Sequence, residues 1–146
     1  MKFDQLQAFL YWWLQTRAIN TPEVENPFIF EGGITGIVLY RQPPFQVQLF
    51  TVKPNSAALD HVHRFVDSFE VYLGGDIDFH VEGSETVLWN GHHITRVKPN
   101  ALHGAGSGEK GCAFLSIQNW GDIKPTSISH DWLDVQGKTS GWVFEK

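Results

Sequence analysis

The residues best suited to chemistry in this sequence are histidines. His61 and His63 are separated by one residue, and in an extended strand such a pair points to the same face of the sheet. Continuing by twos places Asp67 on that face, and His103 follows Pro99 near the start of another predicted strand. Neutral imidazoles with a carboxylate suit a divalent transition metal and leave positions open for water or substrate. We therefore predict a metal site made by His61, His63, Asp67 and His103.

The alternative interpretation of a His-x-His pair is two ordinary surface or core histidines. The acid at matching parity and the histidine after a turn proline favour the metal site over that alternative. Glu70 has the opposite parity and is expected to point outward. Only one of His92 and His93 can face inward, and the Asn90-Gly91 turn before them favours exposure of both. His130 is expected to be solvated.

Other kinds of reactive site find less support in the sequence. Cys112 is the single cysteine, which excludes an intramolecular disulfide, and it is expected to be a small buried residue and not a nucleophile. Ser107 lacks the Gly-x-Ser-x-Gly setting of an activated serine. The glycine-rich run 104–111 lacks the Gly-Lys-Ser/Thr order and the strand-to-helix setting of a phosphate-binding loop, so we expect a mobile flap there. No catalytic residue is assigned.

The elements that must position these side chains are mostly strands. A period of two, with β-branched and aromatic residues between Gly, Pro and Asn turns, runs from Ile34 to Asn119. It predicts strands at Ile34–Arg41, Phe45–Lys53, His61–Leu73, Asp76–Val81, Thr86–Trp89, His92–Val97 and Cys112–Asn119. Short strands at this spacing indicate an all-β sandwich or barrel.

The two ends of the chain have a different pattern. Apolar residues from Phe3 to Leu14 recur at helical spacing, so residues 1–20 are predicted to form an N-terminal helix. That helix either packs on its own domain or makes a subunit contact. Residues 28–120 are predicted to form the barrel, and residues 121–146 a C-terminal tail packed on it, within one domain.

The spacing of these residues resembles the two motifs of the cupin superfamily. The first motif is a glycine, a His-x-His pair, an acid and a second glycine, and the matching residues are Asn55, His61, His63, Asp67 and Gly74. The second runs from a glycine through a proline to a histidine, matched by Gly91, Pro99 and His103. Asn55 replaces a glycine, and Asp67 replaces a glutamate that is one methylene longer.

The resemblance implies a small single-domain cupin: a double-stranded β-helix (jelly-roll) barrel, here with an N-terminal α-helix. It also implies a divalent transition metal, Fe, Mn, Ni or Zn, held by the histidines. Proteins with this layout include dioxygenases, isomerases and lyases as well as proteins that only bind small molecules. We therefore expect either a metal-dependent enzyme acting on a small molecule in the barrel or a non-catalytic structural or binding module.

The composition limits the classes of molecule that the protein is expected to bind. The 146-residue chain has a net charge of −5 and no lysine or arginine cluster, which argues against nucleic acid and anionic membranes. No apolar run is long enough to cross a bilayer, so we expect a cytoplasmic protein. Arg64 and Arg96 are the only cations in the motif strands, which favours a neutral or weakly charged substrate. The apolar helix face and the tryptophans predict a homodimer.

Overall fold

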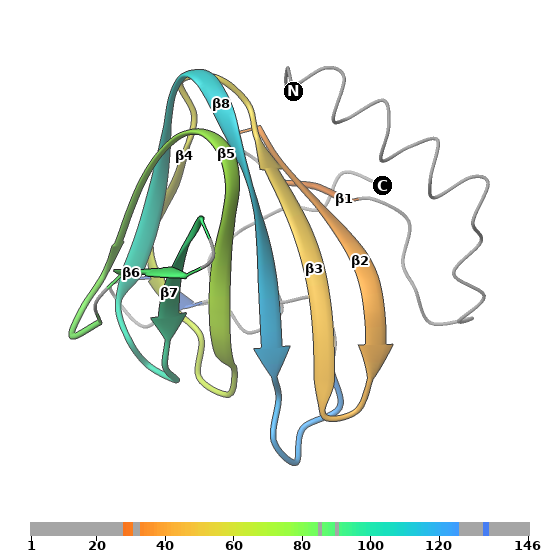
Figure 1. Cartoon of the computed structure of the whole chain (residues 1–146). Coiled ribbons are helices and arrows are strands. Elements are labelled where there is room, and N and C mark those ends of the chain that lie inside the picture. The colour runs from red at the N-terminus through yellow and green to blue at the C-terminus, as the bar shows by residue number, and fades with distance from the viewer. Residues whose placement is uncertain (1–27, 31–32, 85, 90, 126–132, 135–146) are drawn as a thin grey trace.

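Antiparallel strands make up all the regular structure that the computed structural model describes, over residues 28–30, 33–84, 86–89, 91–125 and 133–134 (Figure 1). The strands are β1 (Phe28–Phe30), β2 (Ile34–Gln42), β3 (Phe45–Val52), β4 (Ala57–Val62), β5 (Asp67–Val81), β6 (Thr86–Trp89), β7 (His92–Val97), β8 (His103–Asn119) and β9 (Leu133–Asp134). The predicted all-β class is confirmed. The predicted N-terminal helix lies outside the described residues.

The two longest strands, β5 and β8, pair with each other and fold the sheet over into a barrel. The order of neighbours is β1-β2-β3-β8-β5-β7-β6, and β4 pairs with β8 and β9. The first part of β8, residues 103–106, pairs with β4, whereas residues 112–119 pair with β3. β5 runs antiparallel to both parts of β8. Figure 1 shows β5 and β8 bending together, with β2 and β3 on one side and β4 on the other.

The strand predicted over His61–Leu73 is in fact two strands. β4 ends at Val62 and β5 begins at Asp67, with a bend between them. Side chains alternate across a sheet only while the strand is unbroken, so the predicted parity does not carry across this bend. This break changes which acidic side chain faces the interior.

The sequence predicted interruptions between strands at Gly74-Gly75 and at the run 104–111. Neither interruption is present, because the strands continue through these glycines. β5 passes through Gly74 and Gly75 with register shifts on both sides, and Gly75 has a φ of 96°. The run 104–111, expected to be a mobile flap, is the first half of β8. Glycine suits this strand because a Cβ at Gly104 would meet the side chains of Asp60 and His80.

The barrel interior is part apolar and part polar. The main apolar cluster consists of Ile34, Val38, Phe50, Val52, Val66, Cys112 and Trp120. Cys112 is free and buried as predicted, and burial raises the pKa of its thiol to about 12. Beside this cluster, Gln46, Gln48 and Gln118 are fully buried and hydrogen-bonded to one another. Polar groups at this depth need partners, and the hydrogen bonds among the three amides supply several of them.

The ends of the predicted domain are only partly described. β9 pairs with β4 through His61↔Asp134 and Val62↔Leu133, which places one short piece of the predicted tail against the barrel. The rest of the tail beyond residue 125 and the segment 1–20 lie outside the described residues, and the division into helix, barrel and tail stays a prediction. Among the described residues, no helix has the length and apolarity to span a membrane.

Candidate functional site

Three buried histidines meet inside the barrel. His61 on β4 is the cross-strand partner of His103 on β8, and His63 follows directly after β4. Each is about 95% buried, with exposed fractions of 4%, 4% and 5% for His61, His63 and His103. One ring nitrogen from each lies within 4.8 Å of the other two. The structure therefore brings together the three histidines that the sequence predicted.

Backbone carbonyls orient two of these rings. The Nδ1 atom of His61 lies 2.6 Å from the Leu59 carbonyl oxygen, and that of His103 lies 2.9 Å from the Ala101 carbonyl oxygen. Because a carbonyl only accepts, Nδ1 carries the proton and Nε2 carries the lone pair in each neutral ring. This is the arrangement in which histidines ligate metals.

Burial keeps His61 and His103 neutral. It lowers the pKa of His61 far below its ordinary value, and the neighbouring His103 and His63 lower it further. Burial also lowers the pKa of His103. Uncharged imidazoles are the form that coordinates a transition ion, so the donor set fits a divalent transition metal.

The structure does not bring Asp67 to the histidines. Arg96 donates from Nε and Nη2 to its two carboxylate oxygens, at 2.9 and 2.6 Å. Hydrogen bonding from Arg96 lowers the pKa of Asp67. The same guanidinium lies over the ring of Phe69, which is exposed. The prediction that Asp67 is a fourth ligand assumed an unbroken strand, whereas the structure has a bend after His63 and pairs this side chain with Arg96.

Glu70 is the acidic side chain that the fold buries instead. Its exposed fraction is 9%, and Ser68 and Ser116 donate to its Oε1 atom at 2.6 and 2.9 Å. Burial raises the pKa of Glu70 to about 7, against the lowering effect of the two serine hydrogen bonds. The sequence analysis expected Glu70 to point outward. Counting from Asp67 as the first residue of a new strand places Ser68, Glu70 and Tyr72 on the inner face.

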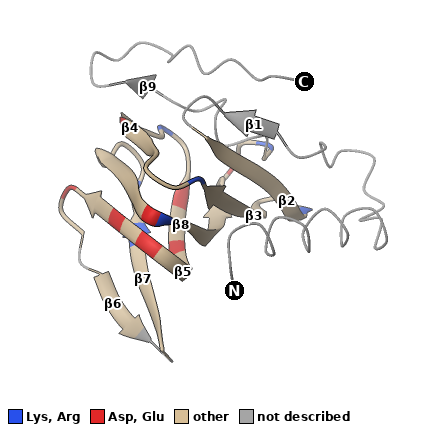
Figure 2. Ribbon diagram, turned by 90° about the horizontal axis from the view of Figure 1, so that it is seen from above, with Lys and Arg blue, Asp and Glu red and all other residues tan. Residues whose placement is uncertain are grey.

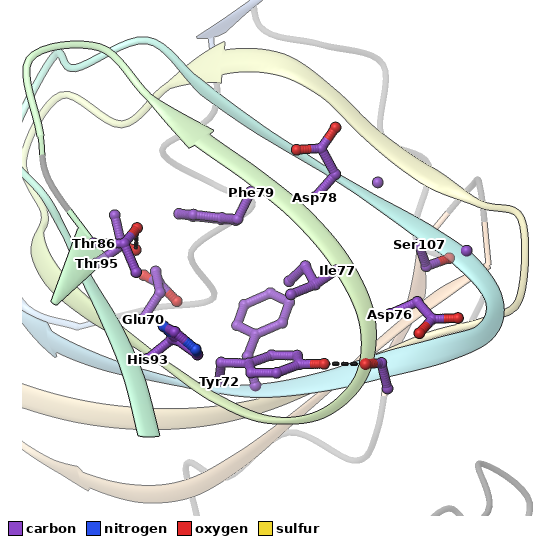
Figure 3. A pocket seen from close by; sticks show the side chains of 14 residues that line it. Glu70, Tyr72, Asp76, Ile77, Asp78, Phe79, Thr86, His93, Thr95 and Ser107 are labelled. Atoms are coloured by element: carbon purple, nitrogen blue, oxygen red, sulfur yellow. Dashed lines mark hydrogen bonds between the residues drawn. The ribbon is translucent and has the colours of Figure 1, made fainter. Parts of the chain in front are cut away.

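Glu70 borders a cavity of about 860 Å³ inside the barrel (Figure 3), a size typical of small-molecule sites. Its lining includes Glu70, Tyr72, Asp76, Ile77, Asp78, Phe79, Thr86, His93, Thr95, Ser107 and Phe114. Figure 3 shows Ile77 and Phe79 on the Glu70 side of β5, with Asp76 and Asp78 on the other side of that strand. Phe79 connects the cavity with the histidines, because its ring centroid lies 6.4 Å from that of His103.

The remaining histidines do not belong to the cluster of His61, His63 and His103. His92 and His93 are both exposed, as expected. His93 also lines the cavity, so the cavity opens to the surface beside this residue. His80 forms an exposed pair with Asp60 at 2.8 Å, and His130 lies outside the described residues.

The fold is similar to those of solved double-stranded β-helix proteins. The structure of KdgF from Halomonas sp. matches with 15% identity and a TM-score of 0.57, over 66% of this chain and 89% of that chain. An RmlC-like cupin from Shewanella frigidimarina matches with 17% identity and a TM-score of 0.54, over 70% and 90%. The 11S allergen from Cocos nucifera matches with 18% identity and a TM-score of 0.53, over 70% and 32%.

No protein-family model matches the sequence, and no curated protein matches it significantly. At these identities the structural likeness establishes the fold. The chain has a double-stranded β-helix fold like these solved structures, as the resemblance to the cupin motifs implied.

Proposed function

We propose that this cupin-fold chain binds one divalent transition metal through His61, His63 and His103 and a small molecule in the adjoining cavity. The observation that carries the proposal is the meeting of three buried imidazole nitrogens within 4.8 Å of one another. Three protein ligands leave coordination positions open. The ion is Fe, Mn, Ni or Zn, and the ligand set alone does not distinguish among them.

A metal-dependent reaction of the dioxygenase, isomerase or lyase type is the activity this arrangement supports best. A metal at the histidines supplies Lewis acidity toward a bound oxygen atom or lowers the pKa of bound water. The chain's own residues prepare the site. Leu59 and Ala101 fix the orientation of two imidazoles, and the ring of Phe79 gives the cavity an apolar wall beside His103.

A non-catalytic binding module is the second candidate. It is favoured by the pairing of Asp67 with Arg96, since no carboxylate joins the three histidines among the described residues. The two candidates differ in whether the purified protein holds a stoichiometric metal.

Metal content measured on purified variants tests the proposal. The wild type is expected to hold one ion per chain, and His61→Ala or His103→Ala to lose it while circular dichroism shows an intact β fold. His92→Ala is the matched histidine control, because His92 does not belong to the cluster. Asp67→Asn is expected to keep the metal, because its partner is Arg96.

Full occupancy in His61→Ala and His103→Ala would show that the metal binds elsewhere. A wild type that takes up no transition metal under any loading condition would remove the enzyme proposal and favour the binding module. Loss of metal in Asp67→Asn alone would restore the aspartate as a ligand.

A further inference from the structure

The cavity has a polar group that the histidine cluster does not use. Glu70 is buried, and its Oε2 atom has no hydrogen-bond partner among the described residues. Its other oxygen is fully engaged by Ser68 and Ser116. A buried carboxyl oxygen without a partner costs free energy, and a ligand in the cavity would remove that cost.

The hydrogen-bond network around Glu70 is directional. Gln118 donates from Nε2 to Ser116 Oγ at 3.1 Å, so the Ser116 hydroxyl donates onward to Glu70 Oε1 at 2.9 Å. Trp120 donates in turn to the Gln118 side-chain oxygen at 2.9 Å. Two donors at Oε1 hold the carboxyl in one orientation. Oε2 is therefore a fixed recognition atom: an acceptor when Glu70 is ionised, and the site of the proton when it is neutral.

The surroundings of Glu70 limit the charge of a ligand. Among the described residues, no lysine or arginine lines the cavity, so an anionic ligand would meet a carboxyl without a compensating cation. Ile77, Phe79, Phe114 and the ring of Tyr72 provide an apolar wall, which suits a hydrocarbon or aromatic body. Figure 3 shows Glu70 and His93 facing the space in front of Phe79.

We infer that the cavity binds a small molecule with an apolar body and an N–H or O–H donor, a hydroxyl or an ammonium, which is bound by Glu70 Oε2. This deepens the proposed function by naming the ligand class and does not require a metal to be bound. The raised pKa of Glu70 agrees with it, because an ammonium would stabilise the ionised carboxyl and displace its proton.

Calorimetric titration of metal-free protein near neutral pH tests this ligand class. The three probes are benzylamine, benzyl alcohol and benzoate, which have similar aromatic bodies and differ in their polar group. At least one of the two donor probes is expected to bind roughly tenfold more tightly than benzoate, and Glu70→Gln to weaken that probe by a similar factor. Glu82→Gln is the control, because it makes the same change at an exposed residue outside the cavity. It should leave binding unchanged.

Calorimetry of the wild type in two buffers of different ionisation enthalpy adds a measurement that needs no variant. Benzylamine bound at Glu70 should release protons just below neutral pH, whereas benzyl alcohol should release none, which distinguishes an ammonium from a hydroxyl ligand. Benzoate binding as tightly as both donor probes, no effect of Glu70→Gln, or no binding of either donor probe at millimolar concentration would overturn the inference. Since the protein is metal-free, failure here is independent of failure of the metal proposal.

Discussion

At the scale of single residues, the protonation of Glu70 should control how stability depends on pH. Burial raises the pKa of Glu70 from 4.5 to about 7 in the folded protein, so the folded state holds this proton more tightly than the unfolded chain. The free energy of unfolding that Glu70 contributes is therefore largest below pH 4.5 and is lost as the pH rises through 7. The whole shift corresponds to about 3 kcal/mol.

Glu70→Gln should remove this dependence, because glutamine imitates the protonated acid and does not ionise. Urea unfolding of metal-free protein between about pH 5 and about pH 8 should show the variant gaining stability over the wild type as the pH rises. His93, Tyr72, Asp76 and Asp78 also line the cavity, and subtraction of the two profiles cancels their common contribution. A constant difference at every pH would contradict the assignment of the buried proton to Glu70.

At the scale of elements, the bend shared by β5 and β8 depends on particular glycines. Gly111 has a φ of 66°, and a Cβ there would lie 2.6 Å from the carbonyl oxygen of Val52. Gly111→Ala should destabilise the fold by about 2 kcal/mol or more, because both the backbone conformation and the contact are unfavourable. Gly106 lies in the same strand with no atom within 4 Å of a Cβ.

Gly106→Ala is therefore the matched control and should change the free energy of unfolding by no more than about 1 kcal/mol. Thermal unfolding followed by circular dichroism measures both variants. Equal stability of the two would mean that the left-handed conformation at Gly111 does not hold the bend.

At the scale of the whole molecule, we expect a homodimer. The apolar residues from Phe3 to Leu14 recur at helical spacing and predict an apolar surface, which we expect to be buried against a second copy of the chain. The described outer face of the sheet adds two exposed apolar residues, Phe69 and Ile117, which are cross-strand partners on β5 and β8. The half-buried Val47 on β3 is the other partner of Ile117. Light scattering should give about twice the chain mass of 16.6 kDa at micromolar concentration. A species of the single-chain mass would contradict this prediction.

The sequence by itself determined the features that depend on short spacing. The period of two predicted the all-β class, His-x-His placed two imidazoles on one face, and the proline before His103 indicated the third. Cys112 is free and buried, as the sequence predicted for a single cysteine at the start of a strand. These inferences succeed because side-chain direction over two or three residues is set by the local backbone.

Only the tertiary structure decided which acid enters the barrel. Asp67 and Glu70 have opposite parity, and the bend between β4 and β5 decides which of them faces inward. The run 104–111 has the composition of a loop, yet pairing with β4 and β5 makes it a strand. Strand pairing depends on contacts between distant segments, β4 with β8 and β5 with β8, and neither a local pattern nor a glycine count contains that information.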